Sequence, residues 1–415
     1  MSDGPAIDAA RVISDLRELD RRTGGADGAQ RLCWGEGWRA ARKLLEEFLA
    51  EIGVEARRDP AGNLWASLGG EGEPGLALGS HLDSVPDGGG LDGALGVMAA
   101  LGVLRAWAST ADRPPRALTL VDWADEEGAR FGRSLFGSSS FSGTLDPGEL
   151  RGLRDADGNA LTEVLRANGV ELERVTDAGT AGTSPAAYLE LHIEQGPVLE
   201  AEGLPVAAVS GCAGVERHRV TFRGQASHAG TTPMDRRRDA GLAAATAALG
   251  MERIGRERRG VATTGQLRLR PGIPTAVAGE AELVIDLRHP DAEELAAMLA
   301  EAREAGAEAA SERGCELEME RVWGIEPIRF DPELVAAARD ACREVAGSER
   351  VLASGALHDA AEVARVVPAA MMFCPSTGGI SHAKEEDTPE ADLTVAIEAF
   401  GVLANSVLAG PPVRP

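Results

Sequence analysis

The chain has 415 residues, of which 44% are apolar and 26% are charged, a composition typical of a globular protein of two or three domains. Its 42 basic residues stand against 66 acidic ones, which gives a formal net charge of −24. Because nucleic acids and anionic membrane surfaces bind basic patches, this charge argues against both as main partners.

The sequence favours neither a membrane protein nor an exported one. A membrane span needs about 20 consecutive apolar residues, and the longest candidate, residues 93–104, is shorter and rich in glycine and alanine. The first residues lack the basic and apolar regions of a signal peptide. The five cysteines are scattered and form no CxxC pair, which is typical of free thiols in a reducing compartment. We therefore expect a cytoplasmic protein.

Helix and strand patterns alternate along the first half of the chain. Apolar side chains recur at helical spacing from Trp38 to Ile52, and Gly53 follows where a helix end favours a left-handed residue. Strand-like runs lie at residues 54–58, 64–68, 75–79, 116–123 and 187–191, and a helix of small residues is expected at 93–108. Strands separated by helices predict an α/β fold with a mixed sheet and helices on both faces.

A different order of elements begins near Gly214. The patterns are strand, helix, strand, strand, helix and strand, at 215–223, 237–253, 261–270, 279–288, 292–310 and 315–322. This β-α-β-β-α-β order is the ferredoxin-like arrangement. After Pro327 the α/β character returns, with a helix at 332–345. We expect an α/β domain over residues 1–212 and 328–415, interrupted by an inserted domain over residues 213–327.

Polar clusters follow several predicted strands, where α/β proteins assemble their active sites. Four histidines stand in polar or glycine-rich segments: His81 in GSHLDS, His192 in ELHIEQG, His228 in ASHAGTT and His382 in GGISHAK. The carboxylates beside these segments belong to Asp83, Asp87, Asp92, Glu126 and Glu127. Imidazole and carboxylate donors without thiolates suit Zn²⁺, Mn²⁺, Co²⁺ or Ni²⁺, and two such ions can share a water molecule.

Local patterns suggest separate roles for these groups. In the His81-x-Asp83 pattern the imidazole can bind an ion while the carboxylate orients the ring. Side chains of adjacent residues in an extended chain diverge, so one of Glu126 and Glu127 can bind a metal while the other acts as a base. Asp92 stands at the start of a predicted helix, where its carboxylate can bridge two metals.

Simpler interpretations hold for other residues. A lone carboxylate such as Asp87 is more often a solvated loop residue than a ligand. His218 and His289 lie in charged strands and are expected at the surface. The segment 88–93 matches G-x-G-x-x-G, but Asp92 would oppose a pyrophosphate, and no acidic residue closes a second strand about 20 residues further on. We therefore reject a dinucleotide site.

Seven motifs follow one another in the order found in M20-type metal-dependent amidohydrolases. They read GSHLDSVPDGGGLDGALGV, DWADEEGARFG, YLELHIEQGPVLE, ASHAGTTPMDRRRDA, ELVIDLR, SGALHDA and GGISH. Within that family the chain most resembles the N-carbamoyl-L-amino-acid hydrolases, with allantoate amidohydrolases and β-ureidopropionases as near relatives. The matches run from about residue 31 to residue 386, nearly the whole chain.

The resemblance implies a dinuclear metal site in which Asp92 bridges the two ions. The residues that would hold the ions are His81, Asp92 and His192 for one, and Asp92, Glu127 and His382 for the other. Asp83 would support His81, and Glu126 would be the general base. Two divalent metal ions per subunit are expected, with zinc as the first choice and manganese, cobalt or nickel as alternatives.

The resemblance also makes the inserted domain, residues 213–327, a lid and dimerisation domain, and the flanking parts the catalytic metal-binding domain. His228 and Arg288 would reach the substrate, with His228 crossing to the partner's site in a homodimer and stabilising the oxyanion. Arg288 suits a substrate carboxylate because a guanidinium binds both oxygens at once. The other expected substrate contacts are Gln195, Thr275, Gly355 and Ala356.

The implied reaction is hydrolysis of the linear ureido C–N bond of an N-carbamoyl-L-amino acid, or a similar small carboxylate, to amino acid, carbon dioxide and ammonia. The alternatives are an allantoate amidohydrolase, a β-ureidopropionase and an N-acyl amino acid deacylase or dipeptidase. His192, where many peptidase relatives have a carboxylate, favours the carbamoyl hydrolases. A non-catalytic binding protein is a further alternative, against which Glu126 argues because a binder has no use for a base.

The sequence departs from the family pattern in three places. Thr275 replaces a usual asparagine, Leu357 replaces a glycine, and Gly90-Leu91 replace a basic and an aromatic residue. All three are expected near the pocket, whereas the implied metal ligands are intact. We therefore expect the family's chemistry on an atypical substrate.

Overall fold

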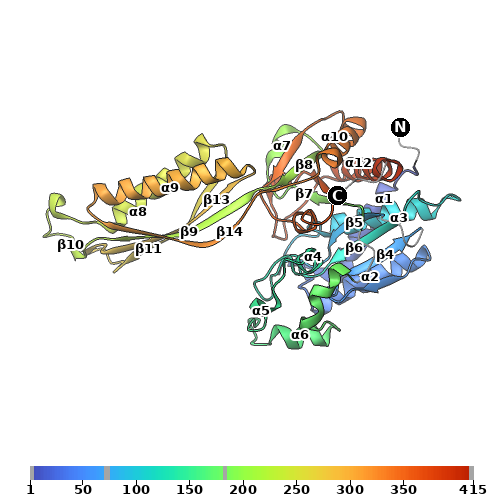
Figure 1. Cartoon of the computed structure of the whole chain (residues 1–415), viewed down its shortest axis with the longest axis horizontal. Helices are drawn as coiled ribbons and strands as arrows, with labels where there is room; N and C mark the ends of the chain where they lie inside the picture. Colours follow the sequence, from blue (N-terminus) through green and yellow to red (C-terminus); the bar gives the residue numbers. More distant parts are fainter. Residues whose placement is uncertain (1–3, 70–74, 181–184, 411–415) are drawn as a thin grey trace. The chain divides into compact units, whose positions relative to one another are not determined.

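A computed structural model describes residues 4–69, 75–180 and 185–410 of the chain (Figure 1). Contacts divide the chain into two compact units. The first comprises residues 1–211, 329–352 and 357–415, and the second comprises residues 212–328 and 353–356. This division does not test the predicted catalytic role of residues 1–212 and 328–415 or the predicted lid role of residues 213–327.

Nine strands form the sheet of the first unit (Figure 1). They are β3 (Ala56–Arg58), β4 (Leu64–Leu68), β5 (Leu76–His81), β6 (Leu118–Trp123), β7 (Ala187–Ile193), β8 (Ala207–Cys212), β15 (Ile328–Arg329), β16 (Val351–Ser354) and β17 (Ala369–Cys374). Their order is β15-β8-β17-β7-β5-β6-β4-β3, with β16 paired to β8. The central pairs β5–β6, β5–β7 and β7–β17 are parallel, whereas β3–β4, β4–β6 and β8–β17 are antiparallel. The sheet is mixed, as the sequence predicts.

One face of this sheet packs against long helices. These are α1 (Ala9–Thr23), α2 (Glu36–Glu51), α3 (Ala94–Ala108), α10 (Pro332–Ala346) and α12 (Glu390–Ala409). The alternate residues Leu189, Leu191 and Ile193 of β7 join this core. Because side chains alternate along a strand, Glu190 and His192 point to the opposite face.

That opposite face is covered by short elements. The helices α4 (Phe136–Ser142) and α11 (Asp359–Val363) contact its strands. The remaining elements of the unit are β1 (Gly24–Gly25), β2 (Gly28–Ala29), α5 (Pro147–Leu150), α6 (Leu161–Ala167), the 3₁₀ helix η1 (Leu172–Thr180), α7 (Val198–Glu202) and η3 (Thr377–Gly379). The central strands are therefore buried on both sides, which explains their near-continuous apolar sequences.

The second unit has the ferredoxin-like fold. Its elements are β9 (Gly214–Arg223), α8 (Ala240–Glu257), β11 (Val261–Arg270), β13 (Glu280–His289), α9 (Ala292–Glu312) and β14 (Glu316–Ile325). The strand order is β11-β13-β9-β14 with every pair antiparallel, and α8 and α9 share one core with the sheet. A short pair of strands, β10 (Ser227–His228) and β12 (Ala276–Val277), and a 3₁₀ turn, η2 (Met234–Arg236), complete the unit.

Aspartate side chains fix where several helices begin. Those of Asp8, Asp146, Asp239, Asp291 and Asp331 accept backbone N–H bonds at the start of α1, α5, α8, α9 and α10. The helix expected to begin at residue 237 therefore starts at Ala240, directly after the Asp239 cap. Periodicity alone gave no reason to prefer that residue.

One expectation about the second unit is wrong. His218 is 1% exposed, although its charged sequence neighbours suggested a surface position. Strand β9 alternates in burial, and His218 falls on the same side as the buried Val220 and Phe222. Its Nε2 lies 2.8 Å from Glu216 Oε2, which satisfies one ring nitrogen in the interior. His289 is partly buried.

Helix α12 has the length and apolar composition of a membrane span. It is a helix of the first unit's core, because 61% of its apolar window is buried inside the protein. It packs against α1, α10 and β17. Leu393, Ile397 and Phe400 lie in the same core as the sheet.

A buried ion pair ties helix α2 to strand β6. Arg42 Nε lies 2.6 Å from Asp122 Oδ2, and the two side chains are 1% and 0% exposed. Asp122 Oδ1 also accepts the backbone N–H of Leu82, the residue after β5, at 2.8 Å. The pair therefore fixes the end of β5 as well as α2.

We expect Arg42→Met to lower the free energy of unfolding by about 3–5 kcal/mol, because it leaves the carboxylate of Asp122 buried without its cation. Urea unfolding measures the change. The matched control is Arg17→Met, which breaks an ion pair with Glu390 whose side chains are 68% and 62% exposed; its effect should stay within about 1 kcal/mol. Equal losses in the two variants would contradict the assignment.

Candidate metal centre

Two histidines meet at one edge of the first unit's sheet. His81 is the last residue of β5, and His192 is the penultimate residue of β7. Because β5 and β7 are parallel neighbours, their carboxyl ends lie at the same edge. The two imidazole centroids are 5.9 Å apart.

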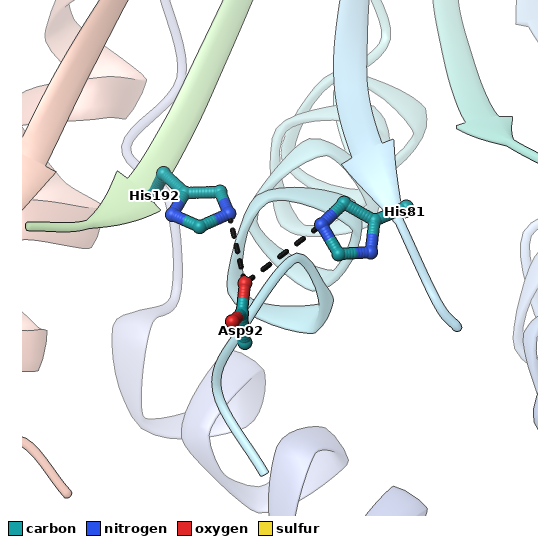
Figure 2. A group of neighbouring side chains, drawn as sticks. All are labelled: His81, Asp92 and His192. Atoms are coloured by element: carbon teal, nitrogen blue, oxygen red, sulfur yellow. Dashed lines mark ion pairs between the residues drawn. The ribbon is translucent and has the colours of Figure 1, made fainter. Parts of the chain in front are cut away.

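Asp92 lies between these rings, as Figure 2 shows. Its Oδ1 is 3.2 Å from Nε2 of His192 and 3.8 Å from Nε2 of His81. Gly93 follows with φ of +66°, and a Cβ at that position would lie 2.4 Å from the His81 ring. Only a glycine therefore lets the segment carrying Asp92 approach His81 so closely.

The other oxygen of Asp92 faces a second group. Asp92 Oδ2 is 3.3 Å from His382 Nε2, which in turn is 3.5 Å from Glu127 Oε2. The ligand atoms of Asp92, Glu127 and His382 lie within 4.8 Å of one another, as do those of His81, Asp92 and His192. All five residues implied as metal ligands thus converge around Asp92.

The hydrogen bonds of the two buried rings leave their inner nitrogens available. His81 Nδ1 lies 3.0 Å from the carbonyl oxygen of Asp83, and His192 Nδ1 lies 2.9 Å from that of Ile193. A carbonyl only accepts, so each Nδ1 carries a proton, and Nε2 is the nitrogen through which each ring can bind a metal. His192 Nε2 and Glu127 Oε1 are two of the buried side-chain atoms in the described residues that have no hydrogen-bond partner. Imidazole nitrogens that face carboxylate oxygens in this way fit a divalent cation.

The electrostatics of the cluster also favour a cation. Burial raises the pKa of the Glu126 carboxyl well above its usual range, and the neighbouring Glu127 adds to this. Burial and the charge of Asp92 raise the pKa of Glu127 to about 8. Burial opposes ionisation of Asp92 too, yet contacts with His192 and His382 hold its pKa well below the usual value. A divalent cation would stabilise all of these carboxylates in their charged form.

Asp83 acts differently from what the sequence suggested. Its backbone oxygen, and not its carboxylate, accepts the His81 hydrogen bond, and the carboxylate lies 3.8 Å from His81 Nδ1. The two carboxylate oxygens instead accept the backbone N–H groups of Glu126 and Glu127, at 3.3 and 3.2 Å. Asp83 therefore orients the backbone of the glutamate pair. Glu126 Oε2 is 3.7 Å from His81 Nε2, so it borders the group of ligands.

Gln195 lies at the second group of ligands. Its Nε2 donates to Asp92 Oδ2 at 2.9 Å and lies 3.4 Å from His382 Nε2. Gln195 and His382 both have positive φ, +57° and +55°, which is uncommon for residues other than glycine. Such strain at two residues of one site is typical of a functional centre.

The remaining expected substrate contacts lie in two places of the second unit. His228 and Thr275 are both exposed and adjacent, since β10 pairs with β12 and Ala229 N–H donates to the Thr275 carbonyl. Arg288 lies near the far end of β13, where its Nη1 donates to the Gly355 carbonyl at 2.7 Å. Ala356 follows in that loop and its N–H donates to Ser354 Oγ.

Sequence reasoning missed two buried side chains at this centre. The ring of His358 lies 4.4 Å from that of His192, centroid to centroid. Glu386 accepts the backbone N–H of Asp92 at 3.0 Å. The motif SGALHDA contains His358 and could have raised it as a candidate, whereas nothing around Glu386 distinguishes it from the exposed Glu385.

The chain is similar to known proteins over nearly its whole length. Residues 77–406 match the model of peptidase family M20/M25/M40. The N-carbamoyl-L-amino acid amidohydrolase of Geobacillus stearothermophilus is 36% identical over 94% of this chain and 95% of its own. The allantoate amidohydrolase of Escherichia coli is 33% identical over 91% of this chain and 92% of its own.

Solved structures agree with this result. An amidase of the hydantoinase/carbamoylase family from Burkholderia multivorans is 33% identical and superposes with a TM-score of 0.91, covering 98% of this chain and 99% of its own. The strand-end histidines, the carboxylate between them and this similarity lead to one conclusion. The chain belongs to peptidase family M20/M25/M40.

Proposed function

We propose that this protein hydrolyses the linear ureido C–N bond of N-carbamoyl-L-amino acids, or of similar small carboxylates. Its relatives make it a hydrolase of carbon–nitrogen bonds in linear amides. The observation that carries the proposal is the buried carboxylate of Asp92, which His192 and His382 face from opposite oxygens. Glu126 supplies a base beside that group.

Allantoate is the second candidate substrate. The E. coli allantoate amidohydrolase and the N-carbamoyl-L-amino-acid amidohydrolase of Paenarthrobacter aurescens are equally similar to this chain, each at 33% identity. Both reactions break a linear ureido bond. The departures at Thr275, Leu357 and Gly90-Leu91 favour a substrate outside the commonest range of the carbamoyl hydrolases. β-Ureidopropionate and N-acyl amino acids remain further candidates.

We assign two divalent ions to each subunit. His81, Asp92 and His192 would hold one, and Asp92, Glu127 and His382 the other, with zinc as first choice and manganese, cobalt or nickel as alternatives. Bound there, the ions would lower the pKa of a shared water and polarise the substrate carbonyl. The Nε2 atoms of the two buried histidines, which face Asp92, and the unpartnered Glu127 Oε1 support this assignment.

Glu126 is the proposed general base and acid. Asp83 orients its backbone, and its carboxylate lies 3.7 Å from His81 Nε2, beside the proposed ligands. Glu126 takes a proton from the attacking water and returns it to the leaving nitrogen. The C–N bond to that nitrogen then breaks, which releases the amino acid and carbamic acid. Carbamic acid decomposes to carbon dioxide and ammonia.

All but one of the proposed substrate contacts belong to the second unit, and Gln195 belongs to the first. Arg288 Nε donates to Asp286 Oδ1 and Nη1 donates to the Gly355 carbonyl, each at 2.7 Å, which leaves Nη2 for a substrate carboxylate. His228 would donate to the oxyanion that forms at the ureido carbon, with Thr275 beside it. Gln195, Gly355 and Ala356 would line the same substrate.

The spacing of these contacts supports a homodimer. His228 pairs with Ala276, just before β13 begins at Glu280, whereas Arg288 lies near the end of β13. Glu280 and Arg288 are eight residue steps apart along the strand, about 26 Å. A small substrate held by Arg288 is therefore out of reach of His228 in the same subunit. We propose that His228 reaches the site of the partner, which makes residues 213–327 the dimerisation and lid domain.

The proposal also assigns a role to each domain and places the protein in the cytoplasm. Residues 1–212 and 328–415 form the catalytic domain, to which all five proposed metal ligands belong. The five cysteines are free, as a reducing cytoplasm would keep them.

Metal content tests the proposed ligands. We expect Asp92→Ala to lose both ions, because its carboxylate serves both groups, and Glu127→Gln to lose affinity for one. Mass spectrometry of the dialysed protein measures the metal. The control is His228→Ala, whose metal content should match the native protein. Full metal content in Asp92→Ala would refute the shared ligand.

Glu126→Gln separates the base from the ligands. The amide keeps the shape of the side chain but accepts no proton, so turnover should fall by about 10²–10⁴-fold with metal content unchanged. Activity is followed as ammonia and amine release from N-carbamoyl, N-formyl and N-acyl amino acids and allantoate. Near-normal turnover in Glu126→Gln would show that Glu126 is not the base. A native enzyme that hydrolyses none of the ureido substrates would refute the proposed reaction.

Mixing two inactive variants tests the crossed subunits. If His228 serves the partner's site, heterodimers of His228→Ala and Glu126→Gln contain one intact site and regain part of the activity. Subunit exchange is verified independently with differently tagged chains. Exchange without any regained activity would show that each subunit uses its own histidine.

A further inference from the structure

The segment that carries Asp92 is held on one side by a buried cation. The side chain of Arg31 is 0% exposed. Its Nε donates to the Leu82 carbonyl at 2.9 Å, and its Nη2 donates to the Gly90 carbonyl at 3.3 Å. Arg31 therefore binds carbonyl groups near both ends of the segment between His81 and Asp92.

A buried anion holds the same segment through its amide groups. Glu386 Oε1 accepts the backbone N–H groups of Leu91 and Asp92, at 3.1 and 3.0 Å. The approach is close, because a Cβ at Gly89 would lie 2.2 Å from that oxygen. Hydrogen bonds from backbone N–H groups to a carboxylate are charge-assisted and stronger than neutral ones. Arg31 and Glu386 thus satisfy opposite kinds of backbone group.

Glu386 also connects this segment to the one that carries His382. Ser381 Oγ lies 2.9 Å from Glu386 Oε2 and 3.2 Å from Asp92 Oδ2. The segment of Glu386 is itself anchored, since Thr377 N–H donates to the Asp387 carbonyl and Thr388 Oγ donates to the Pro375 carbonyl. The carboxylate is therefore a fixed link between two parts of the metal centre.

The location of Glu386 is costly for a carboxylate. It is 7% exposed, and no arginine or lysine among the described residues forms an ion pair with it. Burial and the charge of Asp92 raise its pKa. Hydrogen bonds from two backbone amides and one hydroxyl offset that cost. The hydrogen bonds that Glu386 accepts from Leu91 and Asp92 explain why a carboxylate occupies this buried position.

We propose that Glu386 is a positioning residue that fixes the backbone of Asp92, so that the two oxygens of Asp92 face the two groups of metal ligands. Without Glu386 the Leu91 and Asp92 amides lose their acceptor, and the Asp92 carboxylate turns away from His192 and His382. The inference rests on the metal sites of the proposed function and is independent of the substrate.

Zinc affinity provides the test. Metal-free enzyme is titrated with Zn²⁺ against a chromophoric chelator, and the Co²⁺-substituted enzyme gives a visible spectrum that reports ligand geometry. We expect Glu386→Ala to weaken zinc binding by about 10–100-fold, the usual effect of losing a residue that orients a ligand, and to alter the cobalt spectrum. Glu386→Asp, whose shorter side chain does not reach both amides, should behave similarly.

Two further variants make the test specific. Glu386→Gln keeps an oxygen that can accept the N–H groups of Leu91 and Asp92, so it should keep most of the zinc affinity of the native protein. Glu385→Ala is the matched control, because Glu385 is exposed in the same segment, and it should bind zinc as the native protein does.

Native zinc affinity and an unchanged cobalt spectrum in Glu386→Asp would overturn the proposal, even if Glu386→Ala failed to fold. A loss in Glu386→Gln equal to that in Glu386→Asp would overturn it too, because the acceptor oxygen would then be irrelevant. If the protein does not hydrolyse ureido substrates, the activity assays with N-carbamoyl amino acids and allantoate will show it. The zinc titration does not depend on that result.

Discussion

One buried carboxylate, that of Asp92, faces imidazoles from three distant parts of the chain. Its Oδ1 lies 3.2 Å from His192 Nε2 and 3.8 Å from His81 Nε2, and its Oδ2 lies 3.3 Å from His382 Nε2. A buried charge in this position requires several precise contacts at once. The glycine after Asp92, the parallel strands that carry two of the histidines and the hydrogen bonds to its backbone all meet that requirement.

The fold supplies these contacts through strand alternation. The side chains of β7 that face the long helices are apolar and form the core of the first unit. Its other face carries Tyr188, Glu190 and His192, so stability and chemistry use opposite sides of the same strand. The polar side is buried as well, and several of its polar groups have specific partners. Trp123 Nε1 donates to the Tyr188 hydroxyl, for example, and Ser80 Oγ donates to Glu190.

The second unit contributes in a different way. Its antiparallel sheet separates His228 from Arg288 by most of the length of β13. A rigid strand does not fold back to bring two such residues onto one small molecule. In the proposed active site a second subunit supplies His228, and the length of β13 sets the distance between His228 and Arg288 within one subunit.

The sequence by itself determined the fold class, the ferredoxin-like order of the insertion and the five side chains that converge on the proposed metal site. These follow from local periodicity, from residue chemistry at strand ends and from motif order. Only the tertiary structure decided what depends on partners remote in sequence. Glu386 meets Asp92 across 294 positions, and the Asp83 carboxylate binds amides 43 and 44 positions away. His218 is buried because strand pairing, and not its charged neighbours, decides which face it occupies.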